Sequence, residues 1–123
     1  MADITLAEEG AEFQIPEMES DILPTLVMSA LVGRVPLKTI AYLVLSRAKI
    51  GAAEALRMGL VSRVLGAAAL DAEAEALTAT LLAGGAVSMR AIKQYLTLAP
   101  EMPAAGASGL AAHLVSTALS ARF

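Results

Sequence analysis

The chain contains no cysteine, which excludes disulfide bonds and thiolate chemistry. Its single histidine, His113, and the lack of a dense acidic cluster argue against a metal site. Lysine and arginine form no cluster, and the net charge is −3, so we expect neither a nucleic-acid surface nor an anionic-membrane surface. The N-terminus also lacks the charged-then-apolar pattern of a signal peptide, and we therefore expect a cytoplasmic protein.

Charged residues are scarce. They make up 17% of the 123 residues, against about 25% in ordinary soluble domains. Apolar residues reach 57%, although a single domain of this length has a limited interior. We therefore expect part of the apolar surface to face another chain, in a homo-oligomer. Residues 102–121 lack formal charge apart from His113, but they are rich in Ala, Gly and Ser and contain Pro103, which favours a soluble amphipathic helix over a membrane span.

Alternating apolar and polar residues near the N-terminus predict two short strands, at residues 4–6 and 12–15. Gly10 lies between them, so we expect a hairpin-like arrangement, and Pro16 ends the second strand.

The rest of the chain predicts helices, with a short strand or an extended crossing at residues 60–65. Proline and glycine set most of the expected boundaries, and Ser88 is the expected cap of one helix. The expected helices cover residues 24–32, a segment from Pro36 through Leu45, then 51–58, 70–81, a segment from Ser88 through Leu96, and 104–121. On the second of these helices, we expect one apolar face that includes Leu37, Ile40, Val44 and Leu45.

The segment IGAAEALRMGLVSRVL, which starts at Ile50, combines small helix-packing residues with a glycine stop. It resembles the enoyl-CoA hydratase/isomerase (crotonase) family, in which Ala-x-x-Ala-x-x-x-Gly-Leu-Val recurs after a Ser or Asp. Gly51 stands where the family has that Ser or Asp. The matching residues are Ala52, Glu54, Ala55, Gly59, Leu60, Val61 and Val64.

The opening stretch ADITLAEEGAEFQIPEME is similar to a strand pair of the same family, with matches at Asp3, Ala7, Phe13, Pro16 and Glu17. The resemblance covers nearly all of this chain, but only about the second half of the family domain. It implies an α/β fold, a spiral of ββα units followed by a helical region that drives trimerisation. This chain would be mainly α-helical with a short N-terminal hairpin-like element. Residues 1–66 would belong to the spiral core and residues 67–123 to the helical oligomerisation region.

The resemblance also assigns a role to Glu17, because the Glu after Pro is a catalytic acid/base in this family. We expect Ile22, Leu23 and Thr25 to contribute to substrate binding, and no cofactor beyond the coenzyme A of the substrate. The second Glu of hydratases would precede Met1. Thr25 stands where hydratases commonly have Gly and dienoyl-CoA isomerases have Asp. Glu17 alone favours isomerase-like proton transfer over hydration by two carboxylates.

Two functional hypotheses stay open from the sequence. The first is an enzyme of fatty acid metabolism, a lyase or isomerase that acts on an unsaturated acyl-CoA. It would form a trimer or hexamer and would need a complementing N-terminal half, because that half carries most of the coenzyme A pocket and the oxyanion hole. The second is a non-catalytic helical oligomerisation module derived from such an enzyme. From residue chemistry alone, Glu17 is also compatible with a solvated strand-end carboxylate, and Glu19 and Asp21 with helix-entry acids.

Overall fold

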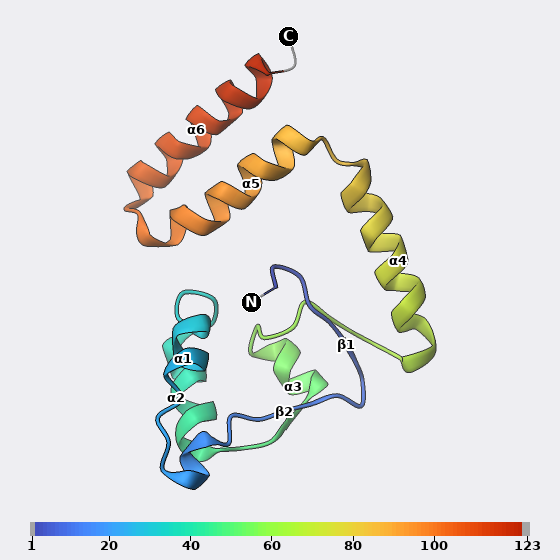
Figure 1. Cartoon of the computed structure of the whole chain (residues 1–123), viewed down its shortest axis with the longest axis vertical. Helices are drawn as coiled ribbons and strands as arrows, with labels where there is room; N and C mark the ends of the chain where they lie inside the picture. Colours follow the sequence, from blue (N-terminus) through green and yellow to red (C-terminus); the bar gives the residue numbers. More distant parts are fainter. Residues whose placement is uncertain (1, 122–123) are drawn as a thin grey trace. The chain divides into compact units, whose positions relative to one another are not determined.

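The structure, a computed structural model, describes residues 2–121 in two compact units. The first unit extends to Glu75 and the second begins at Ala76, so the boundary falls inside helix α4 (Ala67–Ala83). Figure 1 shows the order of the elements along the chain.

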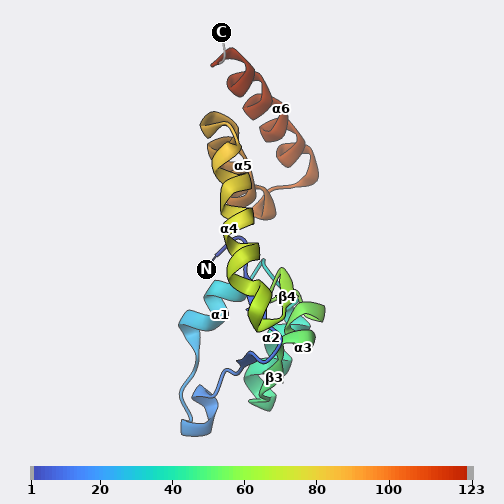
Figure 2. The same ribbon diagram turned by 90° about the vertical axis from the view of Figure 1, so that its right-hand side faces the viewer.

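The first unit contains short strands and short helices in alternation (Figures 1 and 2). A 3₁₀ turn, η1, follows the second strand. Before α4 the elements are β1 (Leu6–Glu8), β2 (Glu12–Phe13), η1 (Glu17–Ser20), α1 (Thr25–Leu31), α2 (Leu37–Ser46), β3 (Ile50–Gly51), α3 (Ala52–Arg57) and β4 (Arg63–Leu65).

The expected hairpin-like pairing of the first two strands is wrong. Strand β1 instead pairs in parallel with β4, with Ala7 opposite Val64, and β2 pairs antiparallel with β3, with Phe13 opposite Ile50. A tight turn in which the Ala11 amide donates to the Glu8 carbonyl, at 2.9 Å, carries the chain from one sheet into the other. Alternation predicts that a segment is extended, but the partner of each strand is set by contacts with segments far along the chain.

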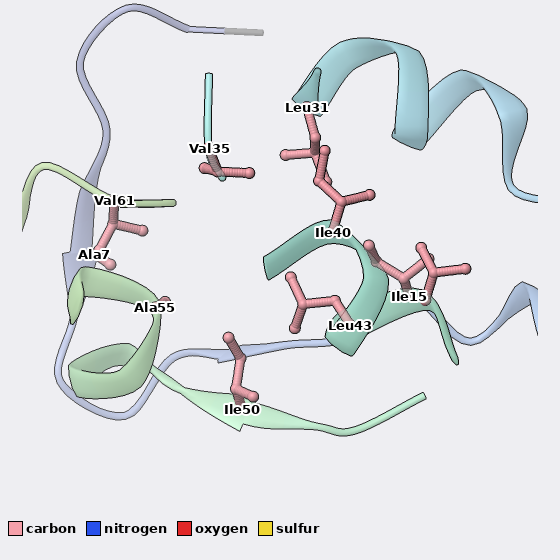
Figure 3. Packing of buried hydrophobic residues seen from close by; sticks show 10 residues of the cluster. Ala7, Ile15, Leu31, Val35, Ile40, Leu43, Ile50, Ala55 and Val61 are labelled. Atoms are coloured by element: carbon pink, nitrogen blue, oxygen red, sulfur yellow. The ribbon is translucent and has the colours of Figure 1, made fainter. Parts of the chain in front are cut away.

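The hydrophobic core of the first unit joins residues of β1, α1, α2, β3 and α3 with residues of the connecting segments (Figure 3). Small side chains let α3 pack closely: Ala55 is 0% exposed, and α3 contacts β2, β3 and β4. Gly59 has φ +80°, so it supplies the left-handed stop that the sequence predicts. The core cluster comprises Ala7, Ile15, Leu31, Val35, Ile40, Leu43, Val44, Ile50, Ala55 and Val61.

Helix α2 buries a narrower face than we predicted. Ile40, Leu43 and Val44 are buried, whereas Leu37 and Leu45 are each 71% exposed. The prediction of one apolar face is therefore wrong for Leu37 and Leu45, which are not buried with the others. The reason is that the rest of the unit covers only one side of the helix. An apolar strip of α2 remains open.

The second unit is helical and contains the rest of α4 together with α5 (Ala86–Leu98), the 3₁₀ turn η2 (Ala99–Glu101) and α6 (Ala104–Ser120). Helices α5 and α6 pack against each other as a hairpin joined by η2. The predicted Ser88 cap is wrong, because α5 already begins after the extended Gly85 and Ser88 lies in its first turn. No described residue from 76 to 121 is buried, so this unit leaves much apolar surface uncovered. Within residues 2–121, no helix combines the length and hydropathy needed to cross a bilayer.

Candidate functional site

The acidic turn, which we define as residues 16–22, begins where the extended segment after β2 ends. Its backbone closes on itself: the Glu19 amide donates to the Pro16 carbonyl at 2.8 Å, and the Ile22 amide donates to the Glu17 carbonyl at 3.1 Å. Asp21 has φ +55°, a left-handed conformation that Asp tolerates better than most residues because its short side chain bonds locally. The sequence therefore folds residues 17–20 into one 3₁₀ turn that projects two glutamates.

The acidic turn is attached to the hydrophobic core on both sides of Glu17. Ile15 is buried, Met18 packs against the core cluster, and the turn contacts α2. This attachment places the start of the acidic turn beside the core.

The carboxylate of Glu17 is unusual among the acidic groups of the chain. Its Oε2 atom is buried and has no hydrogen-bond partner among the described residues. A buried oxygen without a donor costs about 1–3 kcal/mol, and nearly all such atoms in proteins are paired. An oxygen held in this state is free to accept a hydrogen bond from a bound molecule. The buried oxygen does not fit the alternative of a fully solvated strand-end carboxylate.

Glu19, on the same turn, has a different environment. Its Oε1 atom accepts a hydrogen bond from Gln14 Nε2 at 3.2 Å, and the same nitrogen donates to the Arg47 carbonyl at 3.0 Å. Thus Glu19 is tied to its surroundings, whereas the buried oxygen of Glu17 is not.

The three residues that we assigned to substrate binding follow the turn closely. Ile22 and Leu23 are 57% and 63% exposed, and Thr25 is exposed at the start of α1. Ile22 is linked to Glu17 directly through its backbone amide. The turn therefore leads into an open apolar surface.

A cavity of about 310 Å³ lies between β2, α1 and α2. Its lining contains none of Glu17, Ile22, Leu23 and Thr25, but it does contain Gln14, which the sequence did not single out. The sequence marks Gln14 only as a polar residue in the apolar stretch from Phe13 to Pro16, which is a weak indication of a functional role. The lining residues are Glu12, Phe13, Gln14, Ile15, Val27, Leu31, Leu43 and Leu60.

A second hollow, of about 250 Å³, lies between α5 and α6 and has an almost entirely apolar lining. It holds no carboxylate, so it is not a candidate for acid–base chemistry. In the described part of the chain, no group of three or more His, Asp or Glu side chains is arranged to hold a metal ion.

The chain is similar to known proteins of one family. The family profile described as enoyl-CoA hydratase/isomerase matches residues 1–120. Carnitinyl-CoA dehydratases of Escherichia coli and Shigella flexneri are 31% identical over 106 residues, which is 83% of this chain and 40% of theirs. The chain thus spans about 40% of the length of these curated relatives.

Solved structures show the same likeness. A proposed enoyl-CoA hydratase from Thermobifida fusca, in complex with CoA, is 34% identical with a TM-score of 0.83. The match covers 98% of this chain and 46% of that one. An enoyl-CoA hydratase of Mycobacterium smegmatis has a TM-score of 0.87 at 23% identity, with 94% and 45% covered, and this match bears on the fold alone. The crotonase fold that the sequence predicts is confirmed, and the chain belongs to the enoyl-CoA hydratase/isomerase family.

Proposed function

We propose that this chain supplies the acid–base half of an enzyme that acts on an unsaturated acyl-CoA thioester, with Glu17 as the proton-transfer group. The observation that carries the proposal is the buried, unpartnered Oε2 atom of Glu17. It belongs to the Pro-Glu pair that the resemblance marks as catalytic, in a chain of this family. A solvated surface glutamate would have no reason to keep a carboxylate oxygen away from water and from donors.

The chemistry needs one group that accepts a proton and returns it. A thioester acidifies the hydrogens on its α-carbon, because the carbonyl oxygen takes up the negative charge of the resulting enolate. In a 3-enoyl-CoA, Glu17 would take the proton from C2 and return it to C4, which moves the double bond into conjugation without net loss of atoms. In hydration, the water oxygen bonds to C3 and a proton is added to C2, and this reaction commonly uses a second carboxylate.

Of the three carboxylates in the acidic turn, Glu19 is bonded to Gln14, Asp21 is exposed, and only Glu17 has a buried oxygen without a partner among the described residues. We therefore propose the isomerase reaction, which needs one acid–base group, first. Hydration is the second candidate, because the similar proteins include enzymes named as a hydratase and a dehydratase. In both reactions the enolate oxygen needs preorganised hydrogen-bond donors. We propose that these donors come from the part of the family domain that this chain does not span, supplied by another segment.

We further propose that Ile22, Leu23 and Thr25 contact the acyl part of the substrate. One solved relative holds CoA and another structure of it holds acetoacetyl-CoA, which supports a CoA thioester as the substrate class. We propose a cytoplasmic homo-oligomer, a trimer or hexamer, that needs no cofactor besides the coenzyme A of its substrate. The non-catalytic oligomerisation module is less well supported, because it gives no role to the buried Glu17 oxygen.

The test uses the chain together with a segment that completes the family domain, either encoded beside it or taken from a relative. Turnover of crotonyl-CoA and of a 3-enoyl-CoA is measured for this assembly and for its Glu17→Gln variant. The matched control is Glu8→Gln, which neutralises an exposed glutamate on β1. We expect Glu17→Gln to lower kcat by about 10²–10⁴-fold, the range for loss of a general acid–base group, and the control to retain activity. Equal turnover by the parent and Glu17→Gln assemblies would refute the assigned role.

A further inference from the structure

The side chain of Gln14 joins the acidic turn to the end of helix α2. Its Nε2 atom donates to Glu19 Oε1 at 3.2 Å and to the Arg47 carbonyl at 3.0 Å. An amide nitrogen carries two hydrogens, so it can serve both acceptors at once. Both partners are oxygens that accept, so the amide group must turn its nitrogen, and not its oxygen, toward them. The two partners therefore fix the orientation of the amide.

The two acceptors lie on segments that are far apart in the sequence. Glu19 is five positions after Gln14, whereas Arg47 is 33 positions after it. The bond to the Glu19 carboxylate is the longer of the two, and both lie at the exposed surface. The bond to Arg47 takes up a carbonyl just past the last turn of α2, where helix carbonyls have no partner within the helix. Gln14 thus connects the turn to an element that is itself anchored by Ile40, Leu43 and Val44 in the core.

The connection bears on Glu17, because Glu17 and Glu19 share one 3₁₀ turn. The backbone of this turn is held by only a few hydrogen bonds of its own, and the residue that ends it, Asp21, has a left-handed conformation. Fixing Glu19 therefore restricts the turn as a whole, including the residue two positions before it.

We infer that Gln14 is a positioning residue that holds the Glu17 carboxylate in place by tying the acidic turn to the C-terminal end of α2. This role rests on the proposed function of Glu17. Gln14 acts through Glu19 and not by contact with a reacting atom. Its amide serves this role because a bridge between a carboxylate and a carbonyl takes a donor with at least two hydrogens.

The first arm of the test does not depend on catalysis. Amide hydrogen exchange is measured on the chain with Gln14→Met, which keeps the length of the side chain and removes both donors. Gln94→Met, at an exposed position of α5, makes the same substitution away from the turn. We expect faster exchange at residues 17–22 in Gln14→Met and unchanged exchange there in Gln94→Met. Unchanged exchange at the turn in Gln14→Met would overturn the inference, whatever the function of Glu17.

The second arm uses the completed assembly described above. We expect Gln14→Met to lower kcat by about 10–100-fold with little change in KM, because a misplaced catalytic group slows the reaction step without removing substrate contacts. The shorter amide of Gln14→Asn is expected to restore part of the loss. If Glu17→Gln is inactive while Gln14→Met keeps its full kcat, the positioning role is wrong although the proposed function stands. If Glu17→Gln is fully active, the proposed function is wrong, and Gln14 has no catalytic group to position. The exchange measurement still shows in that case whether Gln14 anchors the turn.

Discussion

At the scale of single residues, the 3₁₀ turn η1 and helix α2 are each followed by a non-glycine residue with positive φ. Asp21 has φ +55° and Arg47 has φ +58°. For Arg this conformation costs about 1–2 kcal/mol, because its Cβ atom approaches the following carbonyl oxygen. The Arg47 carbonyl is also the acceptor for Gln14, so the strained residue is part of the attachment of the turn.

Replacing Arg47 with glycine tests this strain. We expect Arg47→Gly to raise the free energy of unfolding by up to about 1 kcal/mol. Glycine adopts positive φ without the steric cost that Arg has there, and its larger loss of backbone entropy on folding offsets only part of this gain. The carbonyl that accepts from Gln14 is kept. Urea denaturation measures the change, and Arg57→Gly at the last position of helix α3 serves as the control, with an expected loss below about 1 kcal/mol. A loss of stability in Arg47→Gly similar to that in Arg57→Gly would show that Arg47 is not strained.

The sequence predicts the position of Glu17, since the Pro-Glu pair stands at the end of a strand-like segment. It does not predict which oxygen of Glu17 is buried, nor that Gln14 bridges Glu19 and Arg47. The bridge joins residues 33 positions apart, and no local pattern encodes a contact of that range.

At the scale of elements, proline and glycine predict the helices well, because they act on the local backbone. Helix α1 follows Pro24, α2 follows Pro36, and α4 ends just before Gly84. Strand partners and buried faces follow different physics. The first two strands pair with later segments and not with each other, and the exposed Leu37 and Leu45 show that apolar spacing alone does not say which face of α2 is covered.

The close packing of α3 gives a prediction at this scale. Ala55 is 0% exposed on α3, which contacts three strands, so a larger side chain has no room there. We expect Ala55→Leu to lower the free energy of unfolding by about 1–3 kcal/mol, the usual cost of overpacking. Ala53→Leu, on the exposed side of the same helix, is the matched control and should change stability by less than about 0.5 kcal/mol. Thermal or urea unfolding measures the free energy of unfolding of both variants. An equal change in the two variants would show that α3 is not tightly packed.

At the scale of the whole molecule, the two units differ in how much they bury. The core cluster lies entirely in the first unit, whereas no described residue from 76 to 121 is buried. We expect this uncovered apolar surface to be an association site. We predicted that residues 1–66 form a part of the core and that residues 67–123 form an oligomerisation region. This division by role stays a prediction.

Association through the second unit is testable directly. Ile92 and Leu96 lie one turn apart on α5, and each is 54% exposed. We expect the chain to sediment as an oligomer and the double variant Ile92→Asp, Leu96→Asp to sediment as a smaller species, because a charge buried at an interface is strongly unfavourable. Arg90→Asp on the same helix replaces a side chain that is already polar, and it controls for the added charge. A parent chain that sediments as a monomer at every concentration would rule out this association.

The central claim is that Glu17 exchanges a proton with the α-carbon of an acyl-CoA thioester. Deuterium incorporation at C2 of butyryl-CoA in D₂O, followed by mass spectrometry, measures this step without requiring a complete hydration or isomerisation. We predict incorporation by the completed assembly and a loss of about 10²-fold or more in Glu17→Gln. Incorporation at the same rate in both proteins would contradict the claim.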